Sequence, residues 1–210
     1  METEIFLVRH GESVSNVENR FVATPPGPGL TEKGVRQSEA ACRIVLARAP
    51  HIGRIFSSPL QRAIETAAPL CDRTAIVPEV RAGLAETAFG AWDGRTAEEL
   101  RGVSQFDAWC ADPEAFPPPG GEALSQVGGR VMDALTRIAR NSDGQTIAAF
   151  THMHPLVWFL RATVGQPYGR VEWLPNCAIV RARWDGRAFH FLSLDLAAAQ
   201  PSDKAGRAVG

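Results

Sequence analysis

Short apolar runs alternate with helix-forming segments along this chain, and this alternation restricts the fold more than any other feature. Runs rich in β-branched and aromatic residues predict buried strands at 5–8, 54–58, 74–77 and 146–150. Helices are predicted to open at Thr31 and to cover 60–67, 123–139 and 156–164. Asp185-Gly186 separates two later runs, 178–184 and 188–194, and predicts a hairpin. The expected fold is therefore α/β: a three-layer sandwich whose mostly parallel sheet has helices on both faces and one antiparallel hairpin near the C-terminus.

Composition narrows the class of protein. With 210 residues, of which 45% are hydrophobic, the chain is expected to form one domain over 1–195, followed by a loosely ordered tail at 196–210. A net charge of −1 provides no general attraction for nucleic acid, and no apolar run or leader predicts membrane association or secretion, so a cytoplasmic protein is expected. A homodimer remains open. The four cysteines are widely spaced, without zinc-site spacing, and are expected to be reduced.

The first predicted strand ends in Arg9-His10-Gly11-Glu12-Ser13, followed by Asn16. A strand that ends this way delivers polar side chains to the carboxyl edge of the sheet, where ligands of α/β proteins bind. Arg9 offers a permanent cation whose planar donors suit phosphate or carboxylate. As an isolated dipeptide, Arg9-His10 would more often be a solvated surface turn, so the case for a site depends on the rest of the chain.

A second candidate is Arg62, which lies one turn into the helix that follows the strand at 54–58. Helix amino termini attract anions through free N–H groups and the helix dipole. The alternative is a solvated arginine, or a local pair with Glu65.

Glu86 lies in a loop among glycines and aromatic residues and could be only part of a turn. Burial against Phe89 and Trp92 is expected to raise the pKa of its carboxyl, which would favour the acid form near neutrality.

The strand at 146–150 leads into Thr151-His152-Met153-His154-Pro155. His-x-His is also a metal-ligand spacing, but no third and fourth ligand follow by spacing, so no metal is expected.

Taken in order, these segments resemble the motifs of the histidine phosphatase superfamily, which includes phosphoglycerate mutases and phosphomonoesterases. The matching segments are Arg9-His10-Gly11-Glu12, Gly29-Leu30-Thr31, Ser57-Ser58-Pro59-Leu60-Gln61-Arg62, Glu86 with the glycines and Trp92 after it, and Thr151-His152. The resemblance implies that His10 is a nucleophile that forms a phosphohistidine and that Glu86 is the proton donor. It also implies that Arg9, Arg62, Asn16 and His152 hold a phosphate ester, without a cofactor or metal.

Two other functions are weighed against a phosphatase. A mutase is disfavoured because Thr87 and Ala88 stand where mutases usually have a basic, aromatic stretch, and because no long insertion precedes His152. A catalytically silent phospho-ligand-binding protein is disfavoured because both His10 and Glu86 are present. The sequence does not identify the ester.

Met153-His154 departs from the family pattern, which commonly has two glycines after the histidine. Thr151, Met153 and His154 are expected to contact the substrate, with His154 setting selectivity beyond the phosphate. Pro155 is expected to restrict His154 to an extended backbone. A histidine that only packs at a helix start is an equal alternative.

Overall fold

The computed structural model describes residues 2–165 and 174–199 of the chain. Its strands are β1 (Thr3–Arg9), β2 (Arg54–Ser57), β3 (Glu79–Val80), β4 (Thr146–Thr151), β5 (Ile179–Trp184) and β6 (Phe189–Asp195). Its α-helices are α1 (Val14–Val17), α2 (Glu32–Arg48), α3 (Gln61–Thr74), α4 (Ala97–Leu100), α5 (Ser104–Ala111), α6 (Leu124–Arg140) and α7 (Met153–Val164). Two short 3-10 helices, η1 (Ala82–Leu84) and η2 (Gly90–Trp92), lie between β3 and α4.

The strands form one sheet in the order β3-β2-β4-β1-β5-β6. β3, β2, β4 and β1 pair in parallel, whereas β5 pairs antiparallel with both β1 and β6. The predicted α/β fold, with a mostly parallel sheet and one hairpin near the C-terminus, is therefore confirmed.

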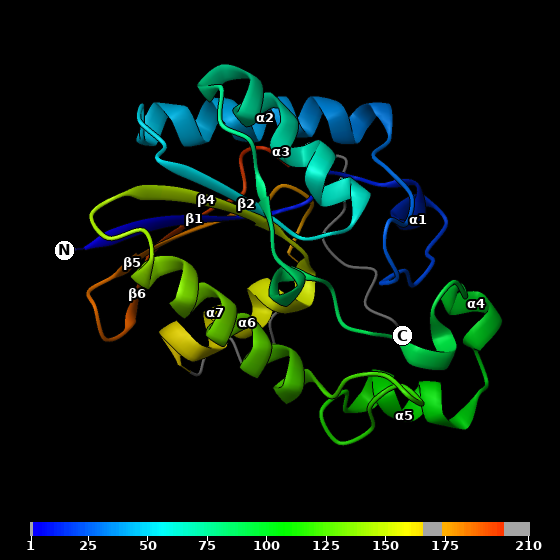
Figure 1. Ribbon diagram of the computed structural model, residues 1–210. Coiled ribbons are helices and arrows are strands. Elements are labelled where there is room, and N and C mark those ends of the chain that lie inside the picture. Colours follow the sequence, from blue (N-terminus) through cyan, green and yellow to red (C-terminus); the bar gives the residue numbers. More distant parts are fainter. Residues whose placement is uncertain (1, 166–173, 200–210) are drawn as a thin grey trace.

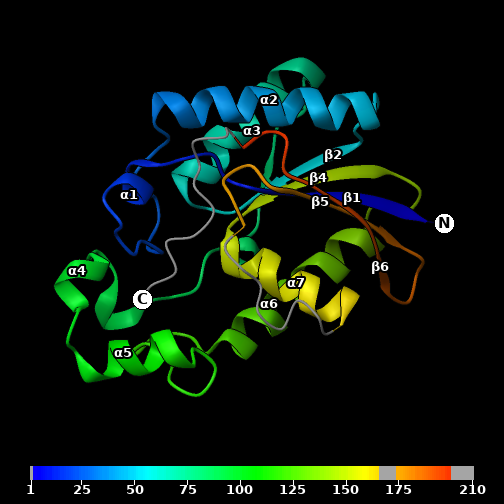
Figure 2. The same cartoon turned by 180° about the vertical axis from the view of Figure 1, so that it is seen from behind.

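Helices cover both faces of this sheet. In Figures 1 and 2, α2 and α3 lie on one face and α6 and α7 on the other, while α4 and α5 form a lobe beyond one end of the strands. Alternate residues of β1 enter the two cores: Phe6 and Val8 pack in the core under α2 and α3, and Ile5 and Leu7 pack in the core under α6 and α7. Burial on both faces explains why this strand is a continuous apolar run.

The predicted strand at 74–77 is wrong. Helix α3 continues to Thr74, Ala75 ends it in a left-handed conformation with φ 56°, and Val77 is 84% exposed. The strand that pairs with β2 is instead the two-residue β3. A short edge strand buries little side-chain surface, so its sequence carries no strand pattern, and the β-branched run before it is left on the surface.

The last helix begins earlier than predicted, at Met153 instead of Leu156. His154 is therefore helical, and the expectation that Pro155 holds it in an extended backbone is wrong. Pro155 occupies the first turn of α7, where the missing N–H has no partner within the helix in any case.

Three other expectations concern the rest of the chain. No disulfide joins the cysteines, which agrees with the expectation that they are reduced: Cys42, Cys71, Cys110 and Cys177 all lie in the described part of the chain. Among the described residues, no helix has the length and apolar character needed to cross a membrane. The predicted loose tail falls mostly outside the described residues; within it, Ala198 is buried in the core under α2 and α3.

Candidate active site

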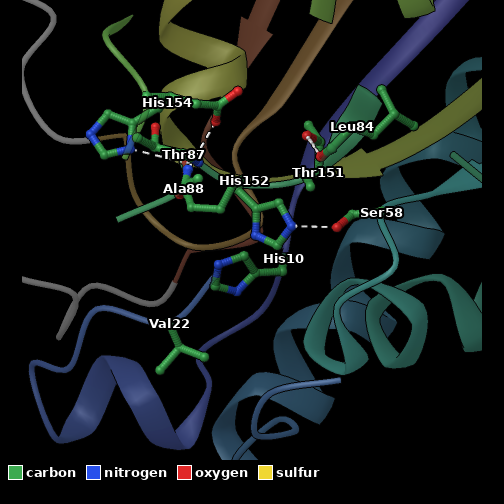
Figure 3. Close-up of polar contacts among 12 residues, drawn as sticks. His10, Val22, Ser58, Leu84, Thr87, Ala88, Thr151, His152 and His154 are labelled. Carbon is green, nitrogen blue, oxygen red and sulfur yellow. Dashed lines mark hydrogen bonds and ion pairs between the residues drawn. The ribbon is translucent and has the colours of Figure 1, made fainter. Parts of the chain in front are cut away.

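The site lies where β1, β4 and β2 end together. Because β1 and β4 are parallel, with Arg9 opposite Thr151, the residues that follow, His10 and His152, emerge side by side. Their ring centroids are 5.0 Å apart (Figure 3). β2 pairs with the other edge of β4, and Ser58, which follows it, reaches His152: the Nε2 atom of His152 and the Oγ atom of Ser58 are 2.7 Å apart. Three segments far apart in sequence thus meet at one edge of the sheet.

His10 is 2% exposed and is held in a single tautomer. Its Nδ1 lies 2.7 Å from the carbonyl oxygen of Gly11, which can only accept a hydrogen bond, so Nδ1 carries the proton and Nε2 carries the lone pair. Burial, followed by the nearby charge of Arg62, lowers the pKa of His10 well below its usual value. The imidazole is therefore neutral at physiological pH, which is the form that a nitrogen nucleophile requires.

Arg62 comes from the first turn of α3 and is 3% exposed. Its Nε donates to Nε2 of His10 at 3.1 Å, and its Nη2 donates to the carbonyl oxygen of Val22 at 2.9 Å. Burial lowers its pKa to about 10, against the opposing attraction of Glu86, so the guanidinium stays charged. Arg62 does not form the alternative pair with Glu65, because the carboxylate of Glu65 accepts hydrogen bonds from Leu30 N and Gln61 Nε2 instead.

Arg9 is also almost fully buried, at 2% exposure, and its Nη1 donates to the carbonyl oxygen of Leu174. Two buried nitrogen atoms close to His10 have no hydrogen-bond partner within the described part of the chain: Nη1 of Arg62 and Nδ1 of His152. Buried donors are rarely left unsatisfied. Two cationic side chains and such nitrogens around one imidazole are suited to an anion with several oxygen atoms.

Asn16 lies on α1 beside this group. Its Oδ1 accepts hydrogen bonds from the backbone N–H of Ser13 at 3.0 Å and from Nδ2 of Asn176 at 3.1 Å. With its oxygen engaged, the Asn16 amide can offer only N–H donors to a ligand, which again suits an anion.

His152 is fully buried, and burial, followed by the charge of Arg62, lowers its pKa well below the usual value. Thr151 directs its hydroxyl to the carbonyl oxygen of Leu84 at 2.7 Å, so it supports the loop that carries Glu86. Met153 packs against the core under α6 and α7. The structure thus brings together the side chains of His10, Arg9, Arg62, Asn16 and His152. Thr151 and Met153 lie beside this group, and the contacts described for them are with other parts of the protein.

Glu86 follows η1 and is 8% exposed. Its Oε1 accepts from the backbone N–H of Thr87 at 2.9 Å and lies 3.0 Å from Nδ1 of His154. Burial raises the pKa of the Glu86 carboxyl, but the contact with His154, with further contributions from His152 and the Thr87 N–H, outweighs it and holds the pKa well below its usual range. The expectation that burial leaves a raised pKa is therefore wrong, because it did not include His154.

The Glu86 loop is fixed by a pair that sequence reasoning missed. Arg130 on α6 donates to the carbonyl oxygens of Gly83, Ala85 and Glu86 at 3.2, 2.8 and 2.8 Å. Glu122 receives two bonds from the same guanidinium and accepts one from the backbone N–H of Ala88. We call Arg130 and Glu122 the loop clamp. The sequence alone does not distinguish these two residues from ordinary surface charges, because it does not show contacts between residues up to 47 positions apart.

Within the described residues, no three His, Cys, Asp or Glu side chains are arranged to hold a metal ion. His152 and His154, the spacing considered for a metal, face Ser58 and Glu86 respectively.

Known proteins resemble this chain in sequence and in structure. The sequence profile of the histidine phosphatase superfamily (branch 1) matches residues 5–196. The chain belongs to that superfamily. An adenosylcobalamin/alpha-ribazole phosphatase of Salmonella typhimurium is 30% identical over 165 residues, which make up 78% of this chain and 80% of that protein.

Two further relatives of this histidine phosphatase superfamily member show how far the similarity extends. A bifunctional protein of Mycobacterium tuberculosis is 37% identical over 161 residues, 76% of this chain, but the chain spans only 43% of that protein. The structure of Bacillus stearothermophilus YhfR superposes with a TM-score of 0.81 at 27% identity, and the match covers 96% of this chain and 100% of that one. The resemblance inferred from the motifs is confirmed.

Proposed function

We propose that this chain is a phosphomonoesterase that hydrolyses a small phosphorylated metabolite through a phosphohistidine at Nε2 of His10. One observation carries the proposal: the imidazole of His10 is neutral and oriented, its Nε2 lies 3.1 Å from Nε of Arg62, and Nη1 of Arg62 and Nδ1 of His152 are buried with no hydrogen-bond partner among the described residues. A phosphoryl group placed against Nε2 of His10 would accept hydrogen bonds from those nitrogens. The phosphatase relatives support the same reaction type.

In the first step, Nε2 of His10 attacks phosphorus and the bond from phosphorus to the ester oxygen breaks. The lone pair that attacks is the one that Arg62 Nε contacts in the free protein, so this N–H must turn from His10 to a phosphoryl oxygen when the ester binds. Arg9, Arg62, Asn16 and His152 then stabilise the charge on the transferring group. Glu86, which is ionised in the free protein, binds a proton when the negatively charged ester lies beside it and gives this proton to the departing oxygen, which leaves as an alcohol.

In the second step, the Glu86 carboxylate takes a proton from water, the water oxygen attacks phosphorus and the nitrogen–phosphorus bond breaks. Phosphate leaves, His10 is neutral again and Glu86 has recovered its proton. General acid and base catalysis of this kind contributes about 10²–10⁴-fold in rate. The cationic side chains neutralise the phosphate, so these steps need no metal ion.

A panel of phosphorylated metabolites, with free phosphate as the readout, tests the proposal. We expect wild-type protein to release phosphate from at least one ester, and to take up acid-labile label from that ester. His10→Ala is expected to lose both properties. A variant that retains more than about a tenth of the rate, or that still takes up label, would refute the role of His10. Transfer of the phosphate to a second hydroxyl instead of water would indicate a mutase, and binding without turnover would indicate the silent alternative.

A further inference from the structure

Glu86 does not stand alone in this site, because His154 replaces the small residue that the superfamily commonly has at that position. Nδ1 of His154 lies 3.0 Å from Oε1 of Glu86, and the two side chains are 13% and 9% exposed. Both hydrogen bonds found on the carboxylate, from Thr87 N–H and from His154, converge on Oε1. The carboxylate is thereby fixed with Oε2 as the oxygen that faces neither partner.

His154 is itself held firmly. It lies in the first turn of α7, and its ring makes edge contacts with Phe89 and Trp109, at centroid distances of 6.1 and 6.4 Å. Trp109 belongs to α5, in the lobe beyond the strand ends (Figure 1). The imidazole therefore contacts two aromatic rings edgewise and has its Nδ1 toward Glu86, which is the geometry of a positioning residue.

We propose that Glu86 and His154 work as one acid–base unit, in which His154 is a positioning residue that fixes the carboxylate and holds the proton which Glu86 delivers to the leaving oxygen. This inference rests on the proposed phosphatase function. The proposal requires that the unit holds one proton in the free protein, between two atoms that lie 3.0 Å apart. When the ester brings two negative charges next to Glu86, the proton moves from Nδ1 to the carboxylate and from there to the leaving oxygen. In the second step the proton taken from water returns to the unit.

The charges that face this unit favour that sequence of events. His152 lies beside Glu86, Arg62 attracts it from α3, and Glu122 repels it from the far side of the loop. Without substrate, the contact with His154, with further contributions from His152 and the Thr87 N–H, keeps the carboxylate ionised despite its burial. A bound phosphate places negative charge near Glu86 and so opposes this bias.

Two variants separate the proton-holding role from packing. His154→Asn keeps a donor near the position of Nδ1 but cannot carry a second proton, and His154→Phe keeps the ring but has no donor. As the pH rises, two coupled groups release their protons in two steps, one at lower and one at higher pH. A lone Glu86 carboxyl would release its single proton at a pH between these two steps. For an alkyl phosphate, we expect His154→Asn to move the alkaline limb of kcat/KM to lower pH by at least about one unit.

With the same alkyl phosphate, His154→Phe is expected to lower kcat by about 10–100-fold while KM changes by less than about threefold. With an activated aryl phosphate, whose leaving group needs little protonation, both variants should keep nearly the wild-type rate. If the alkaline limb stays in place while both variants lose rate equally at every pH, the role of His154 is only structural. If instead KM rises for the preferred ester alone, His154 sets selectivity, and the acid–base unit is refuted.

A measurement without substrate keeps this inference distinct from the proposed function. The pKa of Glu86, followed through its carboxyl carbon by NMR, should rise by at least about one unit in His154→Phe, because the partner that lowers it is gone. An unchanged midpoint would overturn the unit even in an active phosphatase. If no ester were hydrolysed by wild type, the proposed function would fail, while a raised midpoint would still establish the pair.

Discussion

Replacing Arg130 with Met tests whether the loop clamp keeps Glu86 in place. Methionine fills much of the same volume but cannot donate a hydrogen bond. The change removes three bonds to the carbonyl oxygens of Gly83, Ala85 and Glu86, together with the two bonds to Glu122. It also leaves the Glu122 carboxylate without its cation.

The expected loss of stability follows from the exposure of the pair. Hydrogen bonds to charged groups contribute about 1.5–3 kcal/mol each when well buried, and exposed ion pairs contribute about 0–1 kcal/mol. The side chains of Arg130 and Glu122 are each 24% exposed, so water can replace part of what is lost. We expect the free energy of unfolding to fall by about 3 kcal/mol, which lowers Tm by about 6–12 °C for a chain of this length.

Activity should fall for a separate reason. A loop freed at three carbonyls no longer holds the Glu86 carboxylate at hydrogen-bond distance from the ester oxygen. Since a placed acid is worth about 10²–10⁴-fold, we expect kcat for an alkyl phosphate to fall by about 10–100-fold. An aryl phosphate, which needs little protonation, should lose less than about threefold.

The assay pairs urea unfolding with phosphate release on both substrates. Arg137→Met is the matched control, because Arg137 lies on the same helix and its ion pair within the described residues is with Asp133, the two side chains being 77% and 74% exposed. It should change the free energy of unfolding by less than about 0.5 kcal/mol. Arg130→Lys keeps the charge but not the planar fork, and should lie between the two. If Arg130→Met behaves like Arg137→Met in both assays, the loop clamp does not position Glu86.

Three further predictions test other parts of the site. Glu86→Gln should lower the rate with alkyl phosphates far more than with aryl phosphates, and an equal loss on both would rule out the acid role. Burial lowers the pKa of His10 in the folded protein, so below about pH 6.5 the unfolded chain binds a proton that the folded chain does not, and stability must fall with pH. Between pH 7.5 and 5.5, urea unfolding should therefore show wild type losing about 1 kcal/mol more than His10→Ala, and equal losses would mean that the pKa of His10 is not lowered. At Gly83, a Cβ atom would lie 2.5 Å from the Cβ of Ala134, so Gly83→Ala should destabilise the fold by about 1–3 kcal/mol in the same assay, and a neutral effect would show that η1 can move away from α6.

The order of strands and helices could be predicted because each central strand is buried on both faces. β1 and β4 are therefore continuous apolar runs, and the polar residues that end them mark the edge where ligands bind. β3 could not be predicted in this way, because two residues at the sheet edge need no apolar pattern.

The site was predictable where each residue lies at the end of a strand or the start of a helix, as His10 and Arg62 do. The pKa of Glu86 was not, because its direction depends on His154, 68 positions away in the sequence. The loop clamp was missed for the same reason: its contacts join α6 to a loop about 44 positions earlier. Burial can be inferred from neighbours in sequence, whereas compensation of a buried charge depends on partners that only the fold brings together.

The balance of charge at the site explains why a proton should be kept close to Glu86. Arg9 and Arg62 are both buried and together offset a phosphate dianion, so the loaded site would carry one excess negative charge if Glu86 and His154 lost the proton that they share. Uncompensated charge away from water is unfavourable, and one proton on Glu86 or His154 removes it. Binding of a dianionic ester should therefore favour the state in which the acid is ready to act, whereas the free site leaves the carboxylate ionised. A monoanionic inhibitor of the same shape would lack this linkage, so its affinity should depend less on pH than that of a dianionic one, and isothermal titration at several pH values measures the difference.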